Sequence, residues 1–376
     1  KPIFIDMLKK LIISSLFCFL TPASHCQTIK LVFVGDAMVH GQLQKDMAGQ
    51  ESGFSELMQF IKKPLEAADL SHVNVETAVG VPKTDSEKDK KAATAKWGPD
   101  TPYSGFPYFN VHPQYLDALK DAGFDVYQLA NNHSLDRKTR GVDITQAQLT
   151  ERNMLWHGTR KKGSSAYPSI RVPVLKAGKT FFVAYVSCSF STNGNPDYEK
   201  RVPLCFEENS QAVLEEIKHQ KQDLKTDIVV FTPHWGDEYS RVANKQQIEL
   251  AARAAGAGAD IIVGTHPHVL QEYKTIPISA TKDVPVFYSL GNFFNWSINK
   301  DGTDSSVIAE IEMEYHGGEF LPKKITAMPI AANHKKIAKV HQRALLFVKR
   351  DSPEWLREKN SIEKSIPSHI LHYDNQ

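Results

Sequence analysis

The sequence has almost no excess of charge of either sign, and this argues against one large class of function. Its 45 lysines and arginines are balanced by 43 aspartates and glutamates, for a formal net charge of +2. A protein that binds nucleic acid usually carries a basic stripe or a recognisable binding motif, and the sequence shows neither. We therefore expect no nucleic-acid partner. No fixed-period repeat is visible, which excludes a repeat architecture.

Long apolar runs are also scarce. The one that stands out, Leu11 to Leu20, is shorter than the ~20 residues that span a bilayer. It follows the basic stretch Met7-Leu8-Lys9-Lys10 and precedes small and polar residues, which is the order of a secretory signal peptide. We expect residues 1–26 to be a signal peptide with some upstream residues, and the protein to reach the periplasm or cell envelope. A lipoprotein signal ending at Cys26 and an uncleaved membrane anchor are the alternatives.

Cysteine is rare, with four residues at positions 18, 26, 188 and 205. Their spacing matches no zinc motif. Removal of the leader would leave Cys188 and Cys205, which either pair in an oxidising compartment or remain as buried free thiols.

What the sequence does contain is a regular alternation of strands and helices. Branched apolar runs predict strands, and longer segments with helical start and stop signals predict helices. This alternation predicts an α/β fold around a mainly parallel sheet that is buried on both faces. The predicted strands are 29–34, 70–75, 124–129, 181–187, 227–232, 260–263, 284–289 and 308–315, and the predicted helices are 54–68, 113–123, 213–225 and 246–257.

The remaining segments are expected to be less regular. Residues 83–96 are rich in lysine, aspartate and alanine, which indicates a solvated loop, and the aromatic residues of 97–109 favour an ordered loop. From about residue 351 the chain is polar and is expected to be peripheral. We therefore expect one domain over 27–345 and a C-terminal tail over 346–376.

Polar residues that can bind metals follow directly after six of the predicted strands. Because ligands bind beyond the carboxyl ends of strands in open α/β sheets, these side chains would meet at one rim. Imidazole and carboxylate suit zinc, manganese or iron, and two ions about 3.5–4 Å apart can clamp a phosphoryl group. We predict a site for two divalent ions. The predicted ligands are Asp36, Glu76, Asn132, His234, His266 and His268.

Roles for some of these residues follow from their neighbours. Asp36 is the expected bridge between the ions because a carboxylate has two oxygens. His133 is adjacent to Asn132 and cannot easily share one ion with it, so we expect a general acid whose imidazole is oriented by Asp136. Taken singly, each residue also has an ordinary reading, such as a turn or helix cap for Asp36. Their joint position at strand ends favours the metal site.

Two further residues are additional candidates. His40 lies four residues after Asp36, within reach of a metal or a substrate, and Asn292 follows a strand and is expected to shape the rim.

Six motifs, in this order, resemble the CapA family of capsule biosynthesis proteins, within the calcineurin-like metallophosphoesterase superfamily. The resemblance covers roughly residues 29–300. It implies a four-layer α/β/β/α sandwich, a dinuclear centre with the ligands above, a catalytic His133, and a link to poly-γ-glutamate capsule or another envelope polymer. The motifs are Val34-Gly35-Asp36-Ala37-Met38, Asn74-Val75-Glu76-Thr77, Leu129-Ala130-Asn131-Asn132-His133-Ser134-Leu135-Asp136, His234-Trp235-Gly236-Asp237-Glu238-Tyr239, Gly264-Thr265-His266-Pro267-His268-Val269-Leu270-Gln271 and Tyr288-Ser289-Leu290-Gly291-Asn292-Phe293.

The sequence departs from the family pattern at three places. The usual Asp-x-His opening is Asp36-Ala37-Met38, so one ligand is missing unless His40 replaces it. The usual aspartate of the second strand is Glu76, and Arg137 stands where the pattern often has an aromatic residue.

These departures keep more than one function open. The first is a metal-dependent hydrolase of a phosphoester or related bond in an envelope substrate. The second is a non-catalytic protein that binds, exports or assembles an anionic envelope polymer with membrane biosynthesis or export partners. A third is an intact fold whose metal site has decayed.

Overall fold

The computed structural model describes residues 27–47, 53–93, 95, 101–206, 209–294, 302–337, 340–347, 359–360 and 362–373. The expected signal peptide, residues 1–26, lies outside the described residues. Among the helices that the structure does describe, none combines the length and apolar character needed to cross a membrane.

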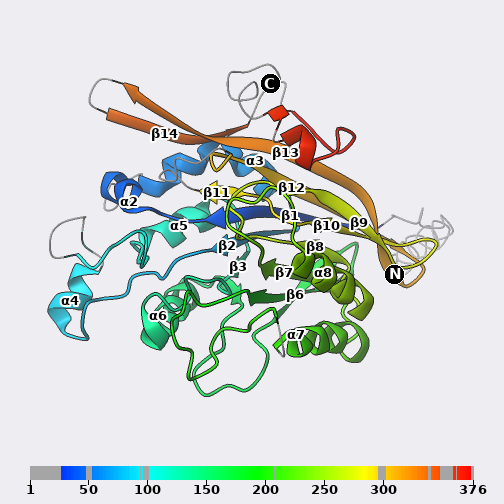
Figure 1. Cartoon of the computed structure of the whole chain (residues 1–376), viewed down its shortest axis with the longest axis horizontal. Coiled ribbons are helices and arrows are strands. Elements are labelled where there is room, and N and C mark those ends of the chain that lie inside the picture. The colour runs from blue at the N-terminus through cyan, green and yellow to red at the C-terminus, as the bar shows by residue number, and fades with distance from the viewer. Residues whose placement is uncertain are drawn as a thin grey trace, which may run out of the picture.

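The larger of two sheets contains eight strands within the described part of the chain. Its centre, from β1 to β4, is parallel, while β12, β13 and β14 extend one side as an antiparallel ribbon that Figure 1 shows along the top of the molecule. In sheet order the strands are β14 (Val340–Phe347), β13 (Glu319–Ile337), β12 (Ser305–His316), β1 (Thr28–Ala37), β2 (Leu70–Val75), β3 (Val126–Gln128) and β4 (Leu155–His157), and β11 (Asn292–Phe294) pairs with the end of β1.

The second sheet has six strands among the described residues. Its four central strands are parallel, and an antiparallel strand closes each edge. In sheet order the strands are β5 (Ile170–Lys176), β6 (Lys179–Ser189), β7 (Ile228–His234), β8 (Ile261–Val263), β10 (Asp283–Phe287) and β9 (Tyr273–Pro277).

The two sheets pack face to face, because successive residues of β1 point to opposite faces and both faces are apolar. Leu31 and Phe33 join an apolar cluster that contains residues of both sheets. Val32 and Val34 join a second cluster, which includes the helices on the outer face of the larger sheet. A third cluster joins the outer face of the smaller sheet to α7 and α8, which lie side by side in Figure 1. These layers confirm the predicted α/β/β/α sandwich.

The helices of the larger sheet's outer layer are α2 (Gly41–Met47), the 3-10 helix η1 (Gly53–Ile61), α3 (Lys62–Glu66), α5 (Gln114–Asp121) and α6 (Lys138–Glu151). The other outer layer contains α7 (Asn209–Lys218), its π-helical continuation η2 (His219–Asp223) and α8 (Lys245–Ala257).

The local structure differs from expectation at several places. The helix predicted over 54–68 is divided into η1 and α3, because Pro64 lacks the N–H that a continuous α-helix would need there. The expected loop 83–96 contains a short helix, α4 (Glu87–Ala92), which the side chain of Ser86 caps by accepting a hydrogen bond from Asp89 N–H. Helix α6 has few apolar positions and was not anticipated.

Part of the expected C-terminal tail packs into the core. Ile362 and Ile366 are fully buried in the cluster between the sheets. The N–H of Ala327 in β13 donates to the carbonyl of Ile370 at 2.7 Å, and this red segment lies beside β13 in Figure 1. The described residues of this segment are therefore not peripheral. Their signal in the sequence is the four-residue spacing of the isoleucines.

Cys188 at the end of β6 and Cys205 form a disulfide bond, which settles the alternative that the sequence left open. Both cysteines are fully buried. The two cysteines are 17 positions apart in the sequence, so the bond holds the segment that follows β6 against the end of this strand.

A buried histidine pair joins the two sheets. Nε2 of His72 in β2 lies 3.1 Å from Nε2 of His157 in β4, and Nδ1 of His157 lies 3.1 Å from Oγ of Ser187 in β6. The ring of Tyr185 stacks on His72 at 5.3 Å between centroids. Burial lowers the pKa of His157 to about 3, and burial and the charge of His157 lower that of His72 well below its usual range.

This pair makes stability depend on pH. Below about pH 6.5 these histidines are protonated in the unfolded state but stay neutral in the folded state. As the pH is lowered further, the free energy of unfolding should therefore decrease by up to about 1.4 kcal/mol per pH unit for each histidine. The contribution is complete above pH 6.5 and is lost as the pH falls towards the folded pKa. When the free energy of unfolding is measured in urea between pH 7 and pH 5, it should depend less steeply on pH in His157→Gln than in the wild type. The difference should correspond to at most one fewer proton bound on unfolding. An unchanged slope would contradict this account.

Candidate metal centre

The carboxyl ends of strands from both sheets meet at one buried site, as the sequence predicts. Asp36 lies near the end of β1 and Glu76 directly follows β2. From the smaller sheet come His234, the last residue of β7, and the loop after β8 that carries His266 and His268. All five side chains are almost completely buried. The site therefore lies where the two sheets face each other.

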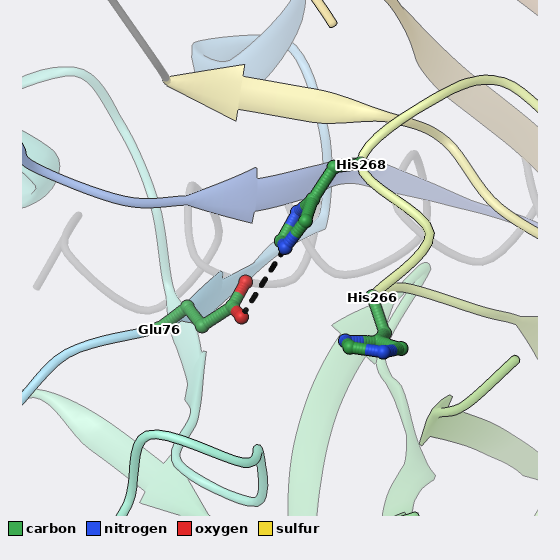
Figure 2. Close-up of side chains that lie close together, drawn as sticks. All are labelled: Glu76, His266 and His268. Atoms are coloured by element: carbon green, nitrogen blue, oxygen red, sulfur yellow. Dashed lines mark ion pairs between the residues drawn. The ribbon is translucent and has the colours of Figure 1, made fainter. Parts of the chain in front are cut away.

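Two sets of three side chains in the described part of the chain have ligand atoms within 4.8 Å of one another. The first contains Asp36, Glu76 and His234, and the second contains Glu76, His266 and His268. Figure 2 shows Glu76 pointing towards His268, with His266 beside them. Glu76 belongs to both sets, whereas Asp36, the expected bridge, belongs to one. The longer side chain of glutamate reaches the space between the two sets.

Asp36 is held in place from both sheets. Its Oδ1 accepts a hydrogen bond from the Asn74 amide at 2.8 Å, and its Oδ2 accepts one from the backbone N–H of His266 at 3.0 Å. Nδ1 of His268 lies 3.2 Å from the same Oδ2 and 3.0 Å from Oδ1 of Asn292. Asn292 thus orients a neighbouring imidazole, which is the rim role expected of it.

His234 is oriented in a similar way. Its Nδ1 lies 3.0 Å from Oγ1 of Thr265, and its Nε2 lies 2.9 Å from Oδ1 of Asn132 and 3.4 Å from Oε1 of Glu76. The amide of Asn132 in turn donates to Oδ1 of Asn193 at 3.2 Å. Asn132 therefore lies beside the first set of ligands, where the sequence places it.

The charges and hydrogen bonds of the site fit a divalent cation. Neither carboxylate oxygen of Glu76 accepts a hydrogen bond from a described residue, and Nδ1 of His266 is also buried without a partner. Such groups are costly to bury unless something compensates them. Burial, followed by the charge of Asp36, raises the pKa of Glu76 well above its usual range.

His234 and His266 have the protonation state that metal binding needs. Burial lowers the pKa of His234 to about 3 and that of His266 well below its usual range. Neutral imidazole is the form that ligates metals. Burial by itself would raise the pKa of Asp36, but the hydrogen bonds that its carboxylate makes with His268 and Asn74 outweigh this effect, and its pKa is lowered. The residues present therefore fit metal ions bound between Glu76 and its neighbours.

His133 lies beside this cluster and is fixed by Asp136, as expected. Its Nδ1 is 2.8 Å from Oδ2 of Asp136, and the same oxygen accepts the Phe109 N–H at 2.7 Å. The Phe109 ring packs edge-on against the imidazole at 4.7 Å between centroids. This arrangement occupies Nδ1 and leaves Nε2 for a substrate.

His40 does not join either set of ligands among the described residues. It packs against Phe109, 5.1 Å between centroids, and its Nε2 is buried without a partner. Burial, followed by the charges of His268 and His133, lowers its pKa to about 4. His40 therefore lies near the site but outside both sets of ligand atoms, and its role as an additional ligand stays a prediction.

Three residues that the sequence did not single out support the site. Asn74 links Asp36 to His234, whose Nδ1 is 3.2 Å from the Asn74 amide. Asn131 donates to Asn74 and to the carbonyl of Val75, and it accepts the N–H of His133. Phe109 packs against His133. The two asparagines lie within the six motifs, whereas no sequence pattern around Phe109 points to a role in the site.

The backbone is strained or tightly packed at the strand ends. His266 has a φ of 101° and His268 a φ of 60°, a conformation that costs of order 1–3 kcal/mol for a non-glycine residue and is found at functional sites. A side chain at Gly35 would lie 1.8 Å from the carbonyl oxygen of Gly291. The glycine before Asp36 is thus required for β1 to approach the segment that carries Asn292.

Residues 30–297 match the family model of the bacterial capsule synthesis protein PGA_cap. The chain belongs to this family of capsule synthesis proteins. The family prediction made from the six motifs is confirmed.

Relatives with assigned names agree with this. The chain is 28% identical over 274 residues to the PGA biosynthesis protein CapA of Bacillus subtilis, which covers 72% of this chain and 64% of that protein. It is 30% identical over 283 residues to the capsule biosynthesis protein CapA of Bacillus anthracis, at 68% and 64% coverage. The chain thus spans about 64% of the length of these two relatives.

Similarity to solved structures is weaker. The calcineurin-like phosphoesterase YfkN of Bacillus subtilis aligns over 90% of this chain and 98% of that chain, with 11% identity and a TM-score of 0.44. At these values the likeness gives no residue correspondence.

The shared position of Glu76 leads to a testable difference between ligands. Glu76→Gln should lower divalent-metal affinity at least about tenfold for both sets, since even residues behind the ligands contribute 10- to 100-fold. His234→Gln should weaken only the set that contains it. Elemental analysis and metal titration of the purified variants measure both effects.

The matched control is Glu215→Gln on the exposed face of α7, which should retain the wild-type metal content. Wild-type metal content in Glu76→Gln would show that Glu76 is not a shared ligand.

Proposed function

We propose that this chain is an exported, metal-dependent hydrolase of the phosphoesterase type that acts in the synthesis of an anionic capsule polymer. The observation that supports it most directly is the convergence of Asp36, Glu76, His234, His266 and His268, from two sheets, around buried atoms that lack partners. The pair of His133 and Asp136 lies beside this cluster. Metal ligands next to an oriented acid or base are what such a hydrolase requires.

Two divalent ions, of manganese, iron or zinc, would supply Lewis-acid polarisation of the scissile group and lower the pKa of a water molecule. The residues that would hold these ions are Asp36, Glu76, Asn132, His234, His266 and His268. The neutral histidines and the two buried carboxylates provide the donor set that these metals bind.

The chain's own acid or base is His133. With Nδ1 fixed by Asp136 at 2.8 Å, its Nε2 can donate a proton to the departing oxygen or a hydrogen bond to the phosphoryl group. Phe109 covers one side of the imidazole and limits access of water there.

Family membership supports the polymer as the biological context. The named relatives are called PGA and capsule biosynthesis proteins, and we propose poly-γ-glutamate, another anionic envelope polymer, or a phosphoester intermediate as the substrate, with membrane biosynthesis or export partners. The expected signal peptide and the Cys188–Cys205 disulfide support an oxidising compartment outside the cytoplasm.

The catalytic role of His133 is tested with purified, metal-loaded protein on phosphomonoesters, phosphodiesters and polymer intermediates. His133→Ala should lower kcat about 10²- to 10⁴-fold, the usual contribution of a general acid or base. Asp136→Asn should lower it less, since the imidazole stays in place but loses its orienting charge. Metal content should be unchanged in both variants.

His219→Ala, at an exposed position of η2, is the matched control and should keep full activity. Absence of hydrolysis by the metal-loaded wild type across all three substrate classes would contradict the hydrolase. Polymer production in cells that carry a folded His133→Ala protein would favour the role in polymer binding and export.

A further inference from the structure

A second feature lies next to the candidate metal centre. A cavity of about 530 Å³ is lined by Lys83, Arg137, Lys138 and Arg140, together with Asp136 and several uncharged residues. Its volume is within the usual range of ligand pockets, roughly 300–1,000 Å³. Four of its lining side chains are cationic and one is a carboxylate.

The positive charge of this cavity is only partly compensated. Nη2 of Arg140 pairs with Oδ1 of Asp85 at 2.6 Å. Oδ2 of Asp136 is engaged by His133 and by the Phe109 N–H, and its Oδ1 is buried without a hydrogen-bond partner among the described residues. Nζ of Lys138 donates to the neutral amide oxygen of Asn195 at 2.7 Å. An excess of cations therefore remains in the lining.

Arg137 keeps a hydrogen-bond donor that none of the described residues satisfies. Its Nη2 donates to two neutral oxygens, Oγ of Ser104 and the carbonyl of Tyr108. Its Nε is buried without a hydrogen-bond partner. A guanidinium group matches a carboxylate or phosphate better than a neutral oxygen, because it can donate two parallel hydrogen bonds to the oxyanion.

The chain connects this cavity directly to the metal centre. The turn between β3 and α6 carries Asn132 and His133 to the metal cluster and ends with Arg137 at the cavity. Asp136 contacts His133 and lines the cavity, so the two sites share a wall. The cavity also lies at the N-terminus of α6, whose first turn has no acidic residue and whose dipole favours an anion there.

We propose that this cavity binds an oxyanionic group of the substrate, a carboxylate or a phosphate, with Arg137 as its main contact. The site would hold one charged group of an extended anionic ligand while another part of that ligand lies at His133 and the metal cluster. The inference rests on the proposed function for the nature of the substrate.

Equilibrium binding to the full chain, treated with a chelator, tests the cavity independently of metal and catalysis. The probes are a γ-linked glutamate hexamer, the same hexamer with its carboxylates amidated, and inorganic phosphate. The wild type should bind the charged hexamer and not the amidated one. Arg137→Gln should weaken binding of the hexamer about tenfold, or about 1.4 kcal/mol, and Arg137→Lys should have an intermediate effect.

Two control variants separate the oxyanion contact from other effects. Arg253→Gln removes one positive charge from α8, on the outer face of the other sheet, and should leave binding unchanged. Ser104→Ala removes the hydrogen bond that Nη2 of Arg137 donates to Oγ of Ser104 but keeps the guanidinium group. This variant should also bind the hexamer like the wild type. Thermal unfolding of each variant checks that it is folded.

Competition distinguishes the two oxyanions. Displacement of the hexamer by inorganic phosphate, lost in Arg137→Gln, would assign the cavity to phosphate as well as carboxylate. Binding of the hexamer without such competition would assign it to carboxylates.

Three results would overturn the proposal: no binding of either anion by the wild type, equal binding by the wild type and Arg137→Gln, or an equal loss in Arg253→Gln or Ser104→Ala. Failure of the proposed function is recognised separately. If the protein binds no metal and hydrolyses no substrate but still binds the hexamer through Arg137, the proposed anion site would stand and only the proposed hydrolase function would fail.

Discussion

The hydrogen bonds of Asp36 join the two sheets at the point where the candidate site forms. One oxygen accepts from Asn74, in the neighbouring strand of the same sheet, and the other accepts from the backbone of His266, in the loop that follows β8 of the other sheet. Both bonds are buried, where a lost partner costs about 1–3 kcal/mol. The face-to-face packing of the sheets brings these groups together, and the remaining ligands depend on the position that Asp36 fixes.

This arrangement concentrates polar groups that are unfavourable for the protein by itself. Glu76 is buried as a member of both sets of potential ligands, and none of the described residues donates a hydrogen bond to its oxygens. His266 is held in a strained backbone conformation. Proteins retain such features at functional sites and compensate for them with the rest of the fold. Here the compensation is the apolar packing between and outside the two sheets. The segment between β3 and α6 then carries His133 beside the candidate metal centre and Arg137 to the adjacent cavity, so the two proposed sites share one piece of the chain.

Local patterns in the sequence contain much of this organisation. The strand predicted over 29–34 forms the centre of β1, and the helix predicted over 246–257 agrees with α8, which begins at a capping box and ends before Gly258. Polar residues directly after the strands predicted the edge at which the ligands meet, because parallel strands place their carboxyl ends together. The order of the six motifs then predicted the family to which the chain belongs. Each of these signals depends on neighbouring residues, on a short period, or on the direction of a strand.

What the sequence by itself determined is therefore the alternation of elements, the rim that would hold the ligands, and the family. Only the tertiary structure decided which residues lie within contact distance. It placed Glu76 in both ligand sets, left His40 outside them, paired Cys188 with Cys205, and placed Ile366 in the core. The physical reason is the same in each case. Distances between residues far apart in the chain are set by how the two sheets pack, and no local pattern contains that distance.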